Sequence, residues 1–154
     1  MSEHESPLRA VTLRRTGPGA FAIVNDRGEV INIGDGSNAD FTPVELLLAA
    51  IAGCAALDVD FLIRKRSSFE YFGIDIRANK IRDEHGNRLV DIEATFDAEF
   101  PDNDGGERAR NYLATALQQS HDRLCTVTRT VVCGTPVTFR TPDQPLPETA
   151  GPSS

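Results

Sequence analysis

The chain has no excess of positive charge. Its 16 lysines and arginines are outnumbered by 23 aspartates and glutamates, which gives a formal net charge of −7. A nucleic-acid partner requires a basic face, and an anionic membrane surface requires a polybasic segment. We therefore expect neither nucleic acid nor a membrane among the partners, and the negative charge itself favours solubility.

Long apolar runs and targeting signals are also lacking. The most apolar stretch, Leu46 to Leu57, is shorter than the about 20 residues that a membrane-spanning helix needs. The first residues, Met1 to Glu5, are acidic and show neither the basic nor the apolar region of a signal peptide. These features predict a cytoplasmic protein.

Cysteine is scarce. The chain has three cysteines, Cys54, Cys125 and Cys133, and an odd number is not typical of the disulfide framework of a small secreted domain. In a reducing compartment a cysteine is buried filler, a metal ligand or a reactive thiol. His121 could join Cys125 and Cys133 around zinc, but no C-x-x-C or H-x-x-x-H pair supports this, so we expect no metal.

A glycine-rich phosphate loop and a catalytic triad are also missing, and we expect no cofactor.

The spacing of the cysteines bears on which of them could pair. A strand through Cys125 and Cys133 would place both on one face, eight positions apart. At about 3.3 Å per residue they would be much too distant for a disulfide. If a redox pair exists, Cys54 with Cys125 is the better candidate.

The chain is predicted to be one domain, because domains most often have about 100–150 residues and neither a repeat nor a linker divides this sequence. We place the domain at residues 7–140. The segments 1–6 and 141–154 are polar or rich in proline, serine and threonine, and we expect flexible termini there.

Turn residues and alternating patterns predict an α+β domain with largely antiparallel sheets. Thr42, Pro43 and Glu45 form the pattern of a helix start with a capping box, and this helix should continue to about Arg66. An amphipathic second helix is expected at 107–121. Strands are expected at 10–15, 20–25, 30–34, 72–82, 88–100, 125–132 and 136–140.

The middle of the first helix, LLLAAIAGCAAL, is apolar on every side. Such a helix should be buried all round. In so small a domain, either a sheet wraps around it or a second subunit covers its remaining face. The pattern therefore favours a homodimer.

Cys54 lies in this helix, between Gly53 and Ala55. It could be one more small core residue, because free cysteine is among the most buried residue types. A nucleophilic role would require the thiolate form, and Cys54 is too far from the helix start for the helix dipole to help. Asp58, one turn later on the same face, would oppose ionisation. A cation from another segment would then be required, and an arginine is the natural candidate.

Two motifs resemble those of one family. Residues 42–59 (TPVELLLAAIAGCAALDV) are similar to the signature helix of OsmC/Ohr proteins, and residues 124–131 (LCTVTRTV) resemble their second cysteine motif. The first motif is long and specific, the second is short, and the resemblance covers roughly residues 8–140. It implies sheets around a long buried central helix and an intertwined dimer with two active sites at the subunit interface. It also implies a short helical turn after Cys125, in place of the strand that propensity indicates.

The resemblance further implies a thiol-dependent peroxidase. Cys54 would attack an organic hydroperoxide and become a sulfenic acid, and Cys125 would condense with it into a disulfide that a dithiol reductant reopens. The family's activating arginine lies in the early strands, where Arg15 is the nearest match and Arg14 and Arg27 are rivals.

One position departs from the family pattern. The best-characterised members have a glutamate directly after the proline, where this chain has Val44, and its carboxylate comes one residue later at Glu45. Glu45 lies nine positions before Cys54, and this spacing puts the two side chains on opposite faces of the helix. Glu45 is therefore interpreted as the capping residue, unless a dimer brings it to the other subunit's thiol. This departure keeps two alternatives open: a non-catalytic protein that binds a small apolar ligand at the dimer interface, and a thiol redox sensor.

Overall fold

The computed structural model describes residues 7–144 as a mixed α+β fold with antiparallel sheets, which confirms the predicted fold class. Most of the segments predicted to be flexible, residues 1–6 and 145–154, lie outside the described residues. In chain order the elements are β1 (Val11–Gly17), β2 (Ala20–Asn25), β3 (Val30–Gly34), α1 (Pro43–Ile63), β4 (Tyr71–Asp83), β5 (Gly86–Glu99), α2 (Asp104–Gln119), the π-helical turn η1 (Ser120–Leu124) and α3 (Thr126–Val132).

The central helix α1 begins with the predicted capping box. The Thr42 amide donates to Glu45 Oε2 at 2.8 Å, and the Glu45 amide donates to Thr42 Oγ1 at 3.3 Å. The helix ends at Ile63 with Arg64 as its C-cap, slightly earlier than expected. By length and composition alone α1 could cross a membrane, a signal that the central helix of a soluble protein also gives.

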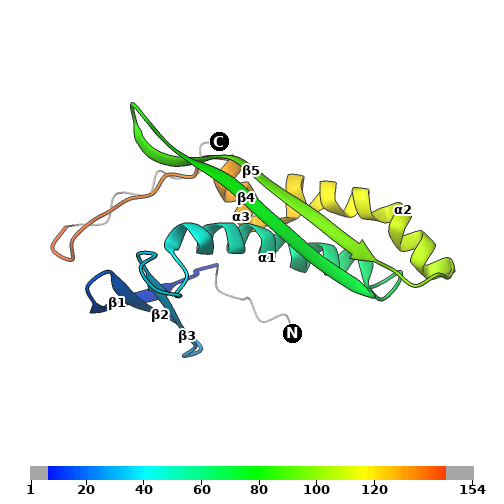
Figure 1. Cartoon of the computed structure of the whole chain (residues 1–154), viewed down its shortest axis with the longest axis horizontal. Coiled ribbons are helices and arrows are strands. Elements are labelled where there is room, and N and C mark those ends of the chain that lie inside the picture. Colours follow the sequence, from blue (N-terminus) through cyan, green and yellow to red (C-terminus); the bar gives the residue numbers. More distant parts are fainter. Residues whose placement is uncertain (1–6, 145–154) are drawn as a thin grey trace.

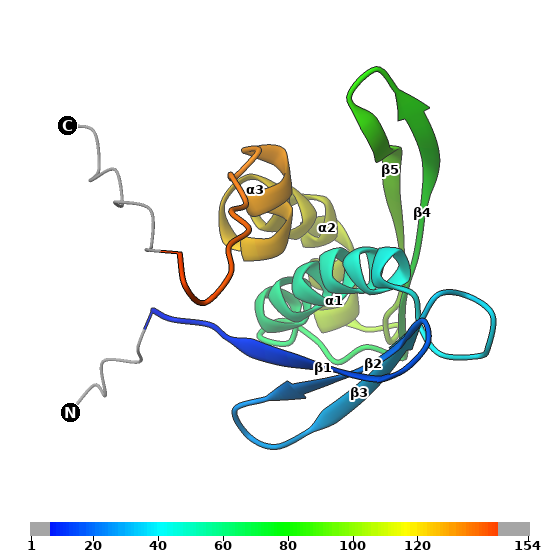
Figure 2. The same cartoon turned by 90° about the vertical axis from the view of Figure 1, so that its left-hand side faces the viewer.

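Among the described residues, only one face of α1 is covered. The β4–β5 hairpin, α2 and α3 all pack around this face (Figures 1 and 2). The buried residues Ile51, Ala55, Val59 and Ile63 recur every four positions, as expected for a single helix face. The row that includes Leu57 and Phe61 stays exposed, with Leu57 at 74%. The predicted burial on all sides is therefore not reached within one chain.

The sheet β1–β3 lies beside α1 and packs little against the rest of the described chain (Figure 2). Its strands pair antiparallel in the order β1-β2-β3, and a single bridge links Ile33 to Phe41. Several of its apolar side chains are uncovered, among them Val11, Leu13 and Ile31. A small sheet with exposed apolar residues has no core of its own, so it must pack against something else to be stable.

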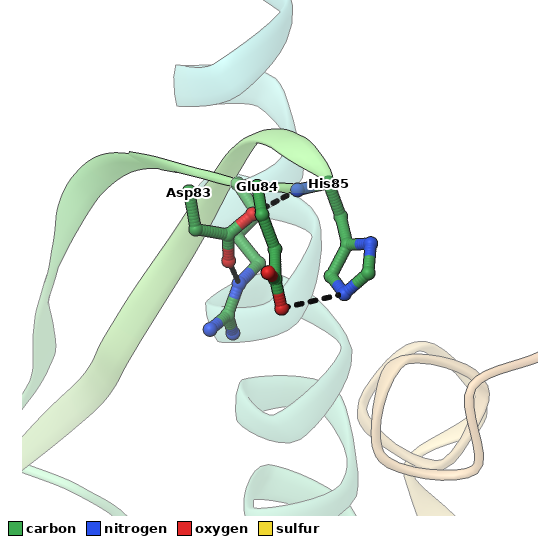
Figure 3. Close-up of polar contacts among 4 residues, drawn as sticks. Asp83, Glu84 and His85 are labelled. Atoms are coloured by element: carbon green, nitrogen blue, oxygen red, sulfur yellow. Dashed lines mark hydrogen bonds and ion pairs between the residues drawn. The ribbon is translucent and has the colours of Figure 1, made fainter.

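The hairpin β4–β5 is long and twisted, and its tip extends past the helices (Figure 1). Glu84 and His85 form the turn, between the strands predicted at 72–82 and 88–100, and their side chains pair at 3.3 Å. Asp83 accepts hydrogen bonds from the His85 amide at 2.9 Å and from Arg88 Nε at 2.7 Å (Figure 3). These contacts are local and exposed, and they shape the turn.

The segment after α2 corrects two predictions made from propensity. Residues 126–132 form helix α3, so the strand prediction was wrong and the helical turn implied by the family was right. Helix α3 lies against α1 and η1, and such tertiary contacts override strand propensity. The predicted last strand was also wrong, because residues 136–140, which the structure describes, form no strand and leave Val137 and Phe139 exposed.

Candidate thiol site

The structure brings the two predicted redox cysteines together. Cys54 lies on α1 and is partly exposed, whereas Cys125 lies at the start of α3 and is completely buried. Their Sγ atoms and a carboxylate oxygen of Asp58 all lie within 4.8 Å of one another. All three cysteines are free thiols, so this is the reduced form of the site.

The wide turn η1 places Cys125 in the interior. The Cys125 amide donates to the Ser120 carbonyl, five residues earlier, at 2.8 Å. This π-type hydrogen bond connects the two residues, and both are buried, with Ser120 at 2% exposure. Single π-helical turns are frequent at functional sites because they redirect side chains within a helix.

Hydrogen bonds hold the members of the cluster in place. The Ser120 hydroxyl donates to Asp58 Oδ2 at 2.9 Å. The Cys125 thiol donates to Thr128 Oγ1 at 3.1 Å, and the Thr128 amide lies 3.4 Å from the same sulfur. Cys125 is therefore both the N-cap of α3 and a fixed neighbour of Cys54.

The surroundings of Cys54 disfavour its thiolate. Burial is the main cause that raises the pKa of Cys54, and a hydrogen bond from the Val127 backbone partly opposes it. The Cys125 side chain and the negative charge of Asp58 raise the pKa further, as expected for the aspartate from its helical spacing. Among the described residues, no cation contributes to the pKa shift of Cys54.

The predicted activating arginines lie elsewhere in the chain. Arg14 and Arg15 are exposed on β1, where Arg15 lies opposite Phe21 of β2 in the strand register. Arg27 is exposed after β2. None of the three shifts the pKa of Cys54 within one chain. The assignment of Arg15 therefore stays a prediction that depends on a second subunit.

The other sequence candidates are not part of the cluster. Glu45 is held by Thr42 in the capping box, where hydrogen bonds from the Thr42 backbone and then its side chain lower the pKa of the Glu45 carboxyl. Cys133 is exposed at the far end of α3, and the exposed His121 contacts Asp122 at 2.8 Å. Cys125 and Cys133 thus lie at opposite ends of a helix. Their predicted distance, too large for a disulfide, assumed a strand, and that assumption was wrong.

Sequence reasoning missed three groups of the site. Ser120 and Thr128 hydrogen-bond to Asp58 and Cys125, and the Val127 backbone contacts Cys54. Only the four-residue spacing from Cys54 to Asp58 was a usable signal. The η1 turn that brings Ser120 to the site has no signature that we could identify in the sequence.

A largely apolar pocket of about 640 Å³ lies close to the cluster, although neither Cys54 nor Cys125 lines it. Side chains of α1, β5, α2 and α3 line it, including Ile51, Phe96 and Leu117. Ser120 and Thr128 also belong to its wall, so the pocket ends beside the residues that hold Asp58 and Cys125. Its volume is in the range of small-ligand sites.

Comparison with known proteins identifies the family. A model of the OsmC-like protein family matches residues 34–140, which is more than half of the chain. The chain belongs to the OsmC-like family. Uncharacterized proteins of Mycobacterium tuberculosis and Mycobacterium bovis are 26% identical over 132 residues, which cover 85% of this chain and 94% of each relative.

Solved structures agree with this OsmC-like fold. A hypothetical protein from Aquifex aeolicus superimposes with a TM-score of 0.66 at 24% identity, covering 83% of this chain and 89% of that one. An OsmC-like protein of unknown function from Vibrio cholerae gives 0.67 at 12% identity, covering 80% and 92%. The organic hydroperoxide resistance protein OhrB of Bacillus subtilis gives 0.52 at 19% identity, covering 80% and 90%. At these identities the likeness concerns the fold.

Proposed function

We propose that this OsmC-like protein is a cytoplasmic, thiol-dependent peroxidase that reduces organic hydroperoxides through Cys54 and Cys125. The observation that carries the proposal is the approach of the two sulfurs to within 4.8 Å, one partly exposed and the other completely buried. A solvent-accessible thiol can meet a peroxide, and a buried neighbour can resolve the oxidised product. The hydroperoxide resistance function of a family member of the same fold supports the substrate class.

The first chemical step uses Cys54. Its thiolate attacks the distal oxygen of the hydroperoxide ROOH, so an S–O bond forms while the O–O bond breaks. The alcohol ROH leaves after taking up one proton, and the sulfur is oxidised to a sulfenic acid. The apolar pocket, whose wall includes Ala55 next to Cys54, is suited to hold the organic part of such a substrate.

The second step uses Cys125. Its sulfur attacks the sulfenic sulfur of Cys54, so an S–S bond forms, the S–O bond breaks and water leaves. The hydrogen bonds between Cys125 and Thr128 fix the position of the attacking sulfur. A dithiol reductant then reopens the disulfide by thiol exchange and returns both thiols to the reduced form.

Activation of Cys54 requires a second copy of the chain. Among residues 7–144 of one chain, no cation offsets the burial and the Asp58 charge that raise the Cys54 pKa. One row of α1 and the sheet β1–β3 leave apolar residues exposed, and large exposed apolar patches are typical of subunit interfaces. We therefore infer a homodimer in which Arg15 of one subunit lies next to Cys54 of the other.

The test is turnover of cumene hydroperoxide with a dithiol by the reduced protein. We expect Cys54→Ser to abolish turnover, and Cys125→Ser to leave a Cys54 sulfenic acid that is trapped by dimedone. Cys133→Ser is the matched control, because this cysteine is exposed and outside the site. Unchanged turnover in Cys54→Ser would refute the proposal. Stoichiometric formation of the disulfide without turnover would instead support a thiol redox sensor.

A second candidate is a non-catalytic protein that binds a small apolar ligand, and the pocket of about 640 Å³ favours it. Solvent extraction and mass spectrometry of the purified protein would detect a co-purified lipid-like molecule. Replacement of Leu117 in the pocket wall by Trp should then reduce the amount recovered. An empty pocket in protein that turns over peroxide would exclude this candidate.

A further inference from the structure

The thiol site contains one group that peroxide chemistry does not use. A carboxylate oxygen of Asp58 lies within 4.8 Å of both cysteine sulfurs, and Asp58 follows Cys54 by one helical turn. The charge of Asp58 opposes the ionisation of Cys54, which is unfavourable for a thiol nucleophile. The same charge attracts a cation.

We propose that Cys54, Cys125 and Asp58 form a binding site for Zn²⁺, with two thiolates and one carboxylate as the protein ligands. Zinc is bound by cysteine at about 2.3 Å and by carboxylate oxygen at about 2.0–2.2 Å, so neighbouring ligand atoms of a tetrahedral site lie about 3.5–3.8 Å apart. The three atoms here already lie within 4.8 Å of one another. Side-chain rotations that shift the atoms by about 1 Å close the site around the metal.

The donor set selects the class of metal. Two sulfur ligands favour zinc and softer ions over magnesium or calcium, which prefer oxygen ligands. Three protein ligands also leave a fourth position for water or another small ligand, the arrangement found in zinc sites that exchange their ligands. Cys54 is partly exposed, so a metal ion can enter from solvent.

The surrounding hydrogen bonds suit a metal-bound form. The Ser120 hydroxyl donates to Asp58 Oδ2 and orients the carboxylate. The backbone of Val127 hydrogen-bonds to Cys54, and the Thr128 amide lies 3.4 Å from the Cys125 sulfur. Each of the three ligands thus has a donor that can stabilise its negative form, as groups around metal ligands commonly do.

Metal binding has a consequence for the proposed peroxidase, and this part of the inference rests on that proposed function. Zinc binding and peroxide reduction use the same two sulfurs. A bound ion blocks both attack on the peroxide and formation of the Cys54–Cys125 disulfide. Zinc therefore inhibits turnover, and oxidation of the site releases the metal.

The test is direct binding of Zn²⁺ to the reduced, full-length protein in competition with a chromogenic chelator, and of Co²⁺ by its thiolate charge-transfer absorption. We expect one ion per chain, which is lost in Cys54→Ser and in Cys125→Ser and retained in Cys133→Ser. Asp58→Asn should weaken binding by about tenfold or more. Asp60→Asn, a neighbour that pairs instead with Arg64, is the matched control and should bind as the wild type does.

The outcomes separate this inference from the proposed function. Absence of the charge-transfer band in reduced wild type, or equal affinity in wild type and Asp58→Asn, overturns the metal site even if peroxide is turned over. Tight binding that depends on all three ligands supports the site even if turnover is absent. Protein oxidised beforehand to the disulfide should bind no zinc, and binding that persists after oxidation would also overturn the proposal.

Discussion

The Ser120 hydroxyl donates a 2.9 Å hydrogen bond to Asp58 Oδ2, and this bond joins the middle of α1 to the wide turn between α2 and α3. Ser120 is buried and Asp58 is partly exposed. In the same turn, the amide of the buried Cys125 donates a hydrogen bond to the Ser120 carbonyl. The position of one cysteine relative to the other therefore depends on a serine that has no chemistry of its own in the proposed reaction.

Replacement of Ser120 by alanine should loosen this connection. The substitution removes one hydrogen bond to a carboxylate, so we expect the free energy of unfolding to fall by about 1–2 kcal/mol. Disulfide formation between Cys54 and Cys125 should also slow, since the η1 turn loses its link to α1. Urea denaturation and the rate of thiol loss after diamide measure the two effects, with the exposed Ser68→Ala as control. A variant that matches the wild type in both would contradict the positioning role.

Replacement of Asp58 by asparagine should lower the pKa of Cys54. The negative charge of Asp58 is one of the causes that raise this pKa, after burial and the interactions with Cys125. Its removal should increase the thiolate fraction near neutral pH and speed alkylation by iodoacetamide several-fold in the presence of a chelator. The pH profile of alkylation should shift to lower pH, while Asp60→Asn leaves it unchanged. A shift in the opposite direction would show that Asp58 does not act through its charge.

Arg15→Gln tests whether a partner subunit activates Cys54. An arginine next to a thiol lowers its pKa by about 1 unit or more, so its loss should leave about tenfold less thiolate at neutral pH. We expect kcat/KM for cumene hydroperoxide to fall by a similar factor and the pH profile to shift to higher pH. Arg88→Gln, at the hairpin turn where Arg88 bonds to Asp83, serves as the control. If Arg14→Gln or Arg27→Gln has the larger effect, that arginine is the activating group instead.

Leu57→Asp tests the dimer. Leu57 is 74% exposed in the middle of an apolar helix, in the row that the chain does not cover. A buried, unpaired charge at a subunit interface is strongly unfavourable, so the variant should be monomeric by sedimentation while it keeps its helical content. Val137→Asp, at a residue that is 78% exposed outside any helix or strand, should leave the oligomeric state unchanged. A monomeric wild type would contradict the interface.

How far the sequence predicts this structure depends on how local the determinants are. The capping box at Thr42 and Glu45 lies within four residues and was predicted correctly. The helix after Cys125 was not predictable from propensity, because contacts with α1 and η1 override the strand preference of residues 126–132. Burial of α1 on every side was expected from composition, yet the described residues of one chain cover only one face, and the proposed second subunit would have to cover the rest.

The site shows the same distinction. Cys54 and Asp58 share a helix face, and their spacing alone places them together. Cys125 reaches them through the η1 turn and the bond from Ser120 to Asp58, and both depend on tertiary structure. The family resemblance supplied the pairing of Cys54 with Cys125 that local patterns could only suggest.

Glu45→Gln separates a structural role from a catalytic one. Hydrogen bonds from Thr42 lower the pKa of the Glu45 carboxyl, so its ionised form stabilises the folded state at neutral pH. That contribution is present above the ordinary pKa of about 4.3 and is lost as pH falls through the lower, folded-state value. We expect Glu45→Gln to be less stable than the wild type at pH 7 and equally stable near pH 2, as measured by thermal unfolding.

The second capping residue gives the matching variant. Thr42→Ala should lower the free energy of unfolding by about 1 kcal/mol, the usual effect of removing a threonine N-cap. Both variants should keep the kcat/KM of the wild type at a temperature where all are folded, because Glu45 is bonded to Thr42 and not to the thiols. If Glu45→Gln instead loses turnover while Thr42→Ala keeps it, the carboxylate acts on Cys54 of the other subunit. In that case the displacement of the glutamate by one residue from the family position would preserve its catalytic role.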